Sequence, residues 1–295
     1  MIPRILVFGS GGQVGSSLVK QADSSPDCQV YGVDQEQLDL TDTRSIGAFI
    51  HEISPDWVVN GAAYTAVDRA EDDVATAHVI NADAPGAMAA ACAAIGAGFI
   101  HYSTDYVFSG ESTRPYRESD ETGPRSVYGV TKLEGEKQVL ANYADSIILR
   151  TAWVYSRDGA NFVNTMLRLA GEREQLGVVN DQHGTPTLAA DLAALALGII
   201  TQNGSKQPGV GIYHATSGGQ TTWFEFCCEI FAVAGISGVR VNPVSTSEYP
   251  TRATRPAYSV LDNSKLQSEF DIALPHWKAS LAHCLSTEGP LLCIG

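Results

Sequence analysis

The first 150 residues alternate two patterns of hydrophobic positions. Short apolar runs rich in β-branched residues predict buried parallel strands, and segments with helical spacing of apolar residues separate them. The predicted strands are residues 5–8, 29–33, 57–60, 98–103 and 146–150, and the predicted helices are residues 13–22, 43–53, 82–96 and 126–143. Because strand and helix alternate strictly, the pattern predicts right-handed crossovers and an α/β fold with a doubly wound parallel sheet.

After Arg150 the pattern changes. Longer loops appear, with GVVNDQHGTPT at 177–187 and a Gly/Ser/Gln-rich turn at 201–211, and helices are predicted near 189–200, 222–235 and 277–285. The final third of the chain has few strand candidates. This part of the chain is therefore interpreted as a smaller, mixed α/β lobe over the carboxyl edge of the sheet, where such folds bind small ligands.

Composition excludes some classes of protein. With 44% hydrophobic and 18% charged residues among 295, the chain is typical of a globular protein. The net charge of −14 argues against a nucleic-acid or membrane-surface partner, since both favour basic patches, but not against a small anionic substrate. No apolar tract is long enough to span a bilayer, and the six cysteines form no C-x-x-C pair. We expect a cytoplasmic protein with free thiols.

A glycine-rich loop follows the first strand and opens the first helix. GSGGQVG has the spacing Gly9, Gly12, Gly15, and residues without Cβ atoms let backbone N–H groups approach a pyrophosphate. The loop, with Gln13 and Val14, predicts a dinucleotide site in a Rossmann-like sheet; a glycine turn without a ligand is the alternative. We therefore expect a dinucleotide-binding domain over residues 1–152, with part of 187–214, and a substrate-binding lobe over 153–186 and 215–295.

The next strand ends contribute further cofactor candidates. Asp34 ends the second strand, where a carboxylate accepts hydrogen bonds from the adenosine ribose, which favours NADH over NADPH. Asp39 and Leu40 are placed to flank the adenine. Small residues follow the third strand, among them Ala62 and Ala63, and they leave room for the cofactor to lie against the backbone.

A phenol and an ammonium share one helix face in SVYGVTKLEGEK. Tyr128 and Lys132 are four residues apart, and a nearby cation lowers the pKa of a phenol from its usual value near 10. Such a pair suits the acid catalysis of carbonyl reduction, and Ser103 and Thr104, after the fourth strand, supply a hydroxyl for the substrate oxygen. The alternative is an ordinary solvated helix face.

These segments together resemble a known family. The glycine loop, STDYVF (103–108), YGVTKLEGE (128–136), LRTAWVYS (149–156), NFVNTMLRLA (161–170) and NDQHGTPT (180–187) are similar to the extended short-chain dehydrogenase/reductases and, within them, to the dTDP-4-dehydrorhamnose reductases. The resemblance covers nearly the whole chain and is weakest after about Tyr258.

The resemblance implies a reaction and roles for individual residues. NADPH or NADH would reduce the C4 ketone of dTDP-4-dehydrorhamnose to give dTDP-L-rhamnose, a nucleotide sugar. Tyr128 would donate the proton, Lys132 would hold the nicotinamide ribose, and Thr104 would position the carbonyl. Asp105 and Trp153 would contact the sugar, and the cofactor side would include Ala62, Ala63, Tyr64, Thr65 and Tyr102.

Two other functions stay open from the sequence. One is a reductase for another nucleotide-linked 4-ketodeoxysugar. The other is a non-catalytic dinucleotide-binding subunit similar to the regulatory subunit of methionine adenosyltransferase. The set of Thr104, Tyr128 and Lys132 favours an enzyme, and Asp105-Tyr106 after the threonine differs from the Asp-Glu pair typical of 4,6-dehydratases.

The remaining polar residues carry weaker predictions. Arg255 either pairs with the substrate diphosphate or is a solvated loop residue like Arg252, and the acidic run at 118–121 is interpreted as a solvated loop. The histidines show no metal-ligand spacing. The resembled family includes magnesium-bridged dimers, but Ser16 and Ser17 follow the glycine loop, so we assign no metal ligands. Mg²⁺ stays open as a cofactor, and a monomer or homodimer is expected.

Overall fold

The computed structural model describes residues 2–203 and 209–286. Its centre is a six-stranded sheet in the order β10-β5-β4-β3-β1-β2, and every neighbouring pair of strands is parallel. The strands are β1 (Arg4–Phe8), β2 (Gln29–Val33), β3 (Trp57–Asn60), β4 (Gly98–Thr104), β5 (Ile147–Thr151) and β10 (Gly211–His214). The five predicted strands therefore form, and a sixth, β10, adds to the edge beside β5.

The order of the strands reverses at β1. The chain passes from β1 to β2 on one side and then returns to β3 on the other side. In open α/β sheets, ligands bind at the carboxyl ends of the strands that flank such a reversal. The fold thus places the glycine loop after β1 and the segment after β3 at one binding edge.

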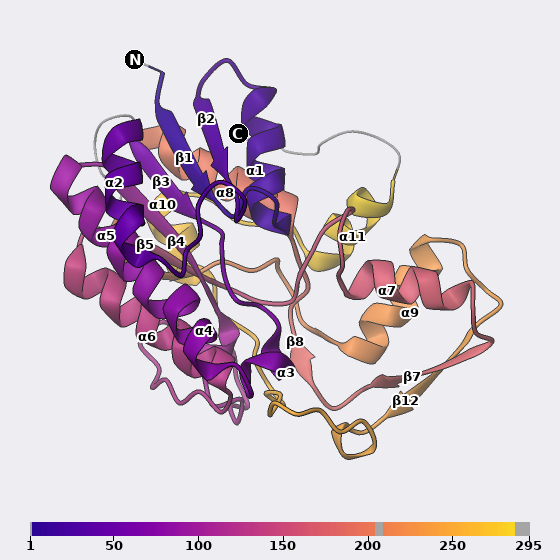
Figure 1. Ribbon diagram of the computed structural model, residues 1–295. Coiled ribbons are helices and arrows are strands. Elements are labelled where there is room, and N and C mark those ends of the chain that lie inside the picture. The colour runs from indigo at the N-terminus through magenta and orange to yellow at the C-terminus, as the bar shows by residue number, and fades with distance from the viewer. Residues whose placement is uncertain (1, 204–208, 287–295) are drawn as a thin grey trace.

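Helices cover both faces of the sheet (Figure 1). One face packs against α2, α5 and α6, which supply buried residues such as Ile50, Met88 and Val139. The other packs against α1, α8 and α10, through residues such as Leu18, Leu192 and Leu266. The helices of this part are α1 (Gln13–Asp23), α2 (Thr43–Ile53), α3 (Val67–Ala70), α4 (Val74–His78), α5 (Ala84–Ile95), α6 (Val127–Asn142), α8 (Ala189–Asn203) and α10 (Ser264–Phe270).

One predicted helix begins later than expected. The helix predicted from residue 82 starts at Ala84, and a π-helical turn (Val79–Asp83) precedes it. Helix α6 lies very close to this turn: a Cβ on Gly135 would be 2.1 Å from the Asn81 carbonyl oxygen. Because Gly135 has no side chain, α6 can pack closely against this π-helical turn.

A smaller lobe, on the right in Figure 1, has its own apolar core. Tyr155, Phe226 and Trp277 meet in that core, although they are far apart in the chain. The elements of this lobe and its connections are β6 (Val154–Tyr155), α7 (Phe162–Ala170), β7 (Gln175–Val179), β8 (His183–Gly184), β9 (Thr187–Leu188), β11 (Thr221–Thr222), α9 (Trp223–Val233), β12 (Arg240–Val244), a 3-10 turn (Thr246–Glu248) and α11 (Trp277–Leu285).

The final third of the chain, where the sequence offers few strand candidates, forms β10, β11 and β12. Strand β12 pairs with β7 in parallel, and β10 completes the large sheet. These strands are short and interrupted by glycine or proline, so their hydrophobic pattern is weak, and pairing with distant strands stabilises them. The boundaries of the two domains stay a prediction.

None of the helices in the described ranges combines the length and the apolar character that a membrane span needs.

Candidate active site

The glycine loop is closed to side chains at two positions. Gly9 has φ +77°, and a Cβ there would lie 2.7 Å from the backbone nitrogen of Ala62; a Cβ on Gly15 would lie 2.1 Å from the Gly9 oxygen. Gly12 is the N-cap of α1 and makes no side-chain capping bond. The first-turn N–H groups of α1 thus meet the requirement for binding an anion such as a pyrophosphate.

The two other predicted residues of this loop have structural contacts of their own. The side-chain oxygen of Gln13 accepts hydrogen bonds from Ser156 Oγ at 2.9 Å and Asn161 Nδ2 at 3.2 Å. Val14 packs, partly buried, against the apolar cluster between the sheet and α8. The Gln13 side chain therefore ties α1 to the segment after β5, and what these residues offer a ligand is their backbone at the start of the helix.

Asp34 lies at the end of β2, directly beside the glycine loop. The backbone N–H groups of Gly9 and Ser10 donate to the Val33 carbonyl at 2.9 and 3.1 Å. One carboxylate oxygen of Asp34 accepts the Glu36 backbone N–H at 3.0 Å, so this oxygen holds the turn that follows the strand. Asp34 lies where a contact to the ribose is predicted, and one of its two carboxylate oxygens already stabilises the turn.

Asp39 and Leu40 lie in the connection between β2 and α2. Asp39 is exposed and accepts the Thr41 backbone N–H at 2.9 Å, which lowers the pKa of its carboxyl group. Leu40 packs partly buried against the cluster of the α2 face. Their side chains are thus used first in the turn and in the core.

The segment after β3 faces the glycine loop. Ala62 donates its backbone N–H to the Asn60 side-chain oxygen at 3.0 Å, and Ala62 is the residue that a Cβ on Gly9 would strike. Ala62 and Ala63 are both partly exposed. The small side chains predicted here therefore border the edge where a dinucleotide would lie.

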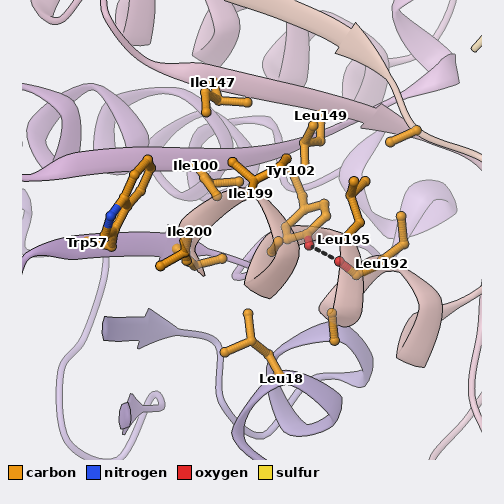
Figure 2. Packing of buried hydrophobic residues seen from close by; sticks show 14 of the residues in the cluster. Leu18, Trp57, Ile100, Tyr102, Ile147, Leu149, Leu192, Leu195, Ile199 and Ile200 are labelled. Carbon is orange, nitrogen blue, oxygen red and sulfur yellow. Dashed lines mark hydrogen bonds between the residues drawn. The ribbon is translucent and has the colours of Figure 1, made fainter. Parts of the chain in front are cut away.

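The side chains of Tyr64 and Tyr102 have hydrogen-bond partners within the protein. The Tyr64 hydroxyl donates to Asp73 at 3.0 Å and accepts from Arg69 at 2.7 Å, so the ring is held in the α3–α4 layer. The Tyr102 hydroxyl donates to the Leu192 carbonyl at 2.7 Å, and Figure 2 shows its ring between the sheet and α8. Both side chains are buried, and the prediction that these residues line the cofactor side stays a prediction. Thr65 is exposed beside Tyr64.

The catalytic candidates meet at the end of β4. Thr104 is the last residue of β4; its hydroxyl donates to Asp105 at 3.0 Å and accepts the Tyr106 backbone N–H at 3.2 Å. Tyr128 packs edge-on against Tyr106, with ring centroids 5.5 Å apart. A Cβ on Gly129 would lie 2.3 Å from the backbone carbonyl oxygen of Tyr106, so this glycine allows α6 to place Tyr128 against the end of β4.

The expected effect of Lys132 on Tyr128 was wrong. Burial raises the pKa of the Tyr128 phenol, and the Thr104 hydroxyl acts in the opposite direction. Lys132 is 2% exposed, and its amine lies 2.7 Å from the Tyr102 carbonyl oxygen and 3.2 Å from His101 Nε2. Burial lowers the pKa of Lys132 to about 8, with Glu136 acting in the opposite direction. The Lys132 amine therefore lies against the backbone at the end of β4.

Asp105 has a buried oxygen without a partner. The residue is 2% exposed, and Oδ2 has no hydrogen bond among the described residues. Burial raises the pKa of the carboxyl group to about 6, and the Ser259 and Thr104 hydroxyls act in the opposite direction. An unpaired acceptor costs free energy, and such groups in native proteins often await a ligand donor.

Trp153 lies in a strained position between the lobes. It has φ 46°, and its ring stacks on Trp223 with centroids 3.6 Å apart and an interplanar angle of 9°. A Cβ on Gly184 would lie 2.4 Å from the indole. Gly184 and Trp223, which sequence reasoning did not connect with Trp153, therefore fix this ring.

Arg255 is not a solvated loop residue. Its side chain is 18% exposed; one terminal nitrogen lies 2.6 Å from an Asp68 oxygen, and the other donates to the Tyr106 hydroxyl at 3.3 Å. Arg252, by contrast, pairs with Asp72 and is largely exposed. Through Tyr106, Arg255 borders the ring of Tyr128. Asp68 and Tyr106 were missed because only the fold brings α3 to the loop at 255.

The interpretation of the acidic run as solvated was wrong for one member. Glu118 accepts the backbone N–H of His214 at 2.9 Å and so stabilises the edge of β10, whereas Asp120 forms an ion pair with Arg114 at 2.8 Å. Within residues 2–203 and 209–286, no group of three or more His, Cys, Asp or Glu side chains could hold a metal ion. Five cysteines in these ranges are free thiols, and Cys293 lies outside them.

The chain matches one family over almost its whole length. The family model described as "RmlD substrate binding domain" matches residues 3–289. A dTDP-4-dehydrorhamnose reductase of Burkholderia thailandensis is 42% identical over 293 residues, covering 96% of this chain and 98% of that protein.

Solved structures agree with this match. A reductase of the same name from Clostridium acetobutylicum is 42% identical with a TM-score of 0.89, covering 96% of this chain and 98% of its own. Another, from Bacillus anthracis in complex with NADP, is 36% identical with a TM-score of 0.91, covering 96% and 99%. With this identity over nearly the full length, and with the Thr104, Tyr128 and Lys132 site at the expected strand end, the chain belongs to the dTDP-4-dehydrorhamnose reductase family.

Proposed function

We propose that this protein is an NAD(P)H-dependent oxidoreductase that reduces the C4 ketone of dTDP-4-dehydrorhamnose (dTDP-4-dehydro-6-deoxy-L-mannose) to give dTDP-L-rhamnose. One observation carries the proposal. Tyr128 packs on Tyr106, whose backbone N–H donates to Thr104 Oγ1 at 3.2 Å, so the phenol and the hydroxyl lie together at the end of β4. Lys132 is buried one helical turn further along α6. This acid and hydroxyl lie on the same edge of the sheet as the glycine loop, which is the arrangement that ketone reduction by a dinucleotide needs.

The residues at the switch of the sheet fit a dinucleotide. Gly9 and Gly15 exclude Cβ atoms from the loop, and α1 begins there without a side-chain cap. When bound, the reduced nicotinamide supplies the hydride that reaches C4. The Bacillus anthracis relative was solved with NADP. The Asp34 carboxylate repels a 2′-phosphate, and we therefore expect NADH to serve at least as well as NADPH.

Tyr128 acts as the proton donor to the oxygen of the reduced carbonyl. Because burial raises its pKa, the phenol stays protonated across the neutral range, and it gives up this proton once the alkoxide, a stronger base, forms at C4. Thr104 holds the carbonyl oxygen close to the phenol by a hydrogen bond. Lys132, whose amine donates to the Tyr102 carbonyl, would hold the nicotinamide ribose.

Three further side chains serve the nucleotide sugar. The unpartnered Oδ2 of Asp105 accepts a hydrogen bond from a sugar hydroxyl, which relieves the cost of its burial. Trp153 offers its ring beside the sugar. Arg255 binds the diphosphate, and because its guanidinium already lies on Asp68, the substrate competes with that ion pair.

The location and the partners of the protein are part of the proposal. The free thiols agree with a reducing, cytoplasmic location. We expect a monomer or homodimer, to be decided by light scattering after size-exclusion chromatography, and turnover without Mg²⁺, to be checked in EDTA. Nucleic acid and membranes are not expected as partners.

A direct assay tests the function. The protein is incubated with NADH or NADPH and dTDP-4-dehydrorhamnose, loss of reduced cofactor is followed by absorbance, and the sugar product is identified by NMR. A product with another C4 configuration, or turnover only with a different 4-ketodeoxysugar, would redirect the substrate assignment. Cofactor binding without turnover on any such sugar would favour a binding subunit.

A further inference from the structure

A buried chain of polar groups leads from β3 to the active-site lysine. Asn60 Nδ2 lies 3.0 Å from His101 Nδ1, and His101 Nε2 lies 3.2 Å from the Lys132 amine. Asn60, His101 and Lys132 are each at most 2% exposed. With so little water in reach, every donor in this chain needs an acceptor from the protein.

The orientation of the Asn60 amide is set by the backbone. Its Oδ1 accepts the N–H of Ala62 at 3.0 Å, and a backbone amide can only donate. The oxygen therefore stays on Ala62, and the NH₂ group faces His101. Since an NH₂ group only donates, His101 Nδ1 must be the acceptor of that bond.

The tautomer of His101 follows from this contact. Burial lowers the pKa of His101 well below its ordinary value, and the positive charge of Lys132 would lower it further, so the ring is neutral. A neutral imidazole that accepts at Nδ1 carries its proton on Nε2. This N–H points at Lys132.

Only an uncharged lysine can complete the arrangement. An ammonium has three N–H groups and no lone pair, so it would face the Nε2–H of His101 donor to donor. A neutral amine accepts the His101 proton with its lone pair and still donates to the Tyr102 carbonyl at 2.7 Å.

The surrounding charges agree with this. The titratable groups near Lys132 are His101 on β4, Tyr128 and Glu136 on α6, and, beyond Glu136, Arg150 on β5. Arg150 donates to both oxygens of Glu136 at 2.8 and 2.6 Å, so the buried carboxylate is already neutralised. A charged Lys132 would be a buried cation without an ion-pair partner of its own.

We propose that His101 is a positioning residue that donates its Nε2–H to Lys132 and thereby holds this lysine as an uncharged amine in the protein alone. Burial by itself lowers the pKa of Lys132 to about 8, and a donor directed at its lone pair lowers it further. A charged Lys132 then requires that the bond to His101 is broken and a proton is taken up. The inference goes beyond the proposed function, and its test uses no turnover.

The first test is NMR of the protein alone. Lysine labelled at Cε reports the titration of Lys132, assigned by loss of its signal in Lys132→Met, and labelled imidazole nitrogens report the tautomer of His101. We expect a lysine midpoint at or below about pH 8 and a His101 proton on Nε2. A midpoint near the ordinary value of about 10.4, or a proton on Nδ1, would overturn the proposal.

The second test reverses the tautomer. In Asn60→Asp the carboxylate keeps Ala62 on one oxygen and accepts from His101 Nδ1 on the other, so Nε2 presents a lone pair and favours the ammonium. The Lys132 midpoint should rise by one unit or more, which is tenfold or more in its ionisation constant.

A matched control separates tautomer from charge. Asn81 is also buried, and its Nδ2 donates to Thr131 at 3.1 Å, next to Lys132 in the chain. Asn81→Asp adds the same charge close to the same helix without contacting His101. A clearly smaller rise than in Asn60→Asp supports the proposal, and an equal rise would show that charge alone moves the lysine and would reject it.

Discussion

The edge proposed to bind the cofactor and the corner proposed for catalysis, at Thr104, Tyr128 and Arg255, are built in different ways. The edge consists of backbone: Gly9, Gly15 and the segment at Ala62 approach within distances that exclude Cβ atoms. The corner consists of side chains whose partners lie far away in the sequence, as in the pair of Arg255 with Asp68, 187 residues apart. A backbone site can be recognised from residue spacing, whereas the chemistry of a side-chain site depends on what the fold buries around it.

The largest effect is expected at the corner. Tyr128→Phe keeps the ring and its packing on Tyr106 but removes the proton, so turnover should fall by about 10²–10⁴-fold. Affinity for the cofactor, measured by titration, should stay near wild type because the glycine loop is unchanged. Near-normal turnover in this variant would show that Tyr128 belongs to an ordinary helix face.

The buried carboxyl group of Asp105 should make the stability of the protein depend on pH. Its pKa in the folded protein is about 6, above the unfolded value of 3.8, so the folded state binds more protons between these values. Stability from this group is present at low pH and is lost as pH rises through that window, by on the order of 2–3 kcal/mol. Wild type minus Asp105→Asn, measured by urea unfolding from pH 4 to 7, should show this fall.

Asp120→Asn is the control for that experiment. The hydrogen bond from Arg114 lowers the pKa of Asp120 to about 2, so its titration lies below the window tested. The stability difference for this variant should stay flat between pH 4 and 7. A flat difference for Asp105→Asn as well would mean that its carboxyl group is not perturbed by burial.

The backbone edge is tested by adding one methyl group. Gly15→Ala would place a Cβ 2.1 Å from the Gly9 oxygen, so the loop must shift, and overpacking of this kind costs roughly 1–3 kcal/mol. Cofactor affinity should fall about tenfold or more. Gly11→Ala, whose Cβ would meet no atom within 4 Å, should bind normally. Equal affinities would remove the steric argument for this edge.

Replacement of Arg255 tests whether this residue binds the diphosphate of the substrate. Arg255→Ala should raise KM roughly tenfold or more and leave kcat within a few-fold, because a diphosphate contact exists in both the ground and transition states. Arg252→Ala removes a nearby, exposed arginine and should leave KM unchanged. An unchanged KM in Arg255→Ala would limit this residue to its ion pair with Asp68.

The smallest effect is expected at Asp34. Replacement by Ala removes the charge that repels a 2′-phosphate, so the ratio of kcat/KM for NADH over NADPH should fall several-fold. The turn after β2 also loses one backbone hydrogen bond there. A wild-type enzyme that strongly prefers NADPH would contradict our interpretation of Asp34.

The sequence by itself determined the parts that depend on local pattern. Strand and helix periods placed five strands of the large sheet, glycine spacing placed the loop after β1, and the segments around Thr104, Tyr128 and Lys132 identified the family. These features depend on residues close together in the chain, where backbone geometry and side-chain period are set locally.

Only the tertiary structure decided the electrostatics and the long-range partners. It showed that burial raises the pKa of Tyr128, that Lys132 contacts His101 and Tyr102, that Trp153 stacks on Trp223, and that Tyr102 is core. It also added β10 to the sheet. The physical reason is that desolvation and pairing depend on which distant segments surround a group, and the spacing of residues along the chain carries no record of those neighbours.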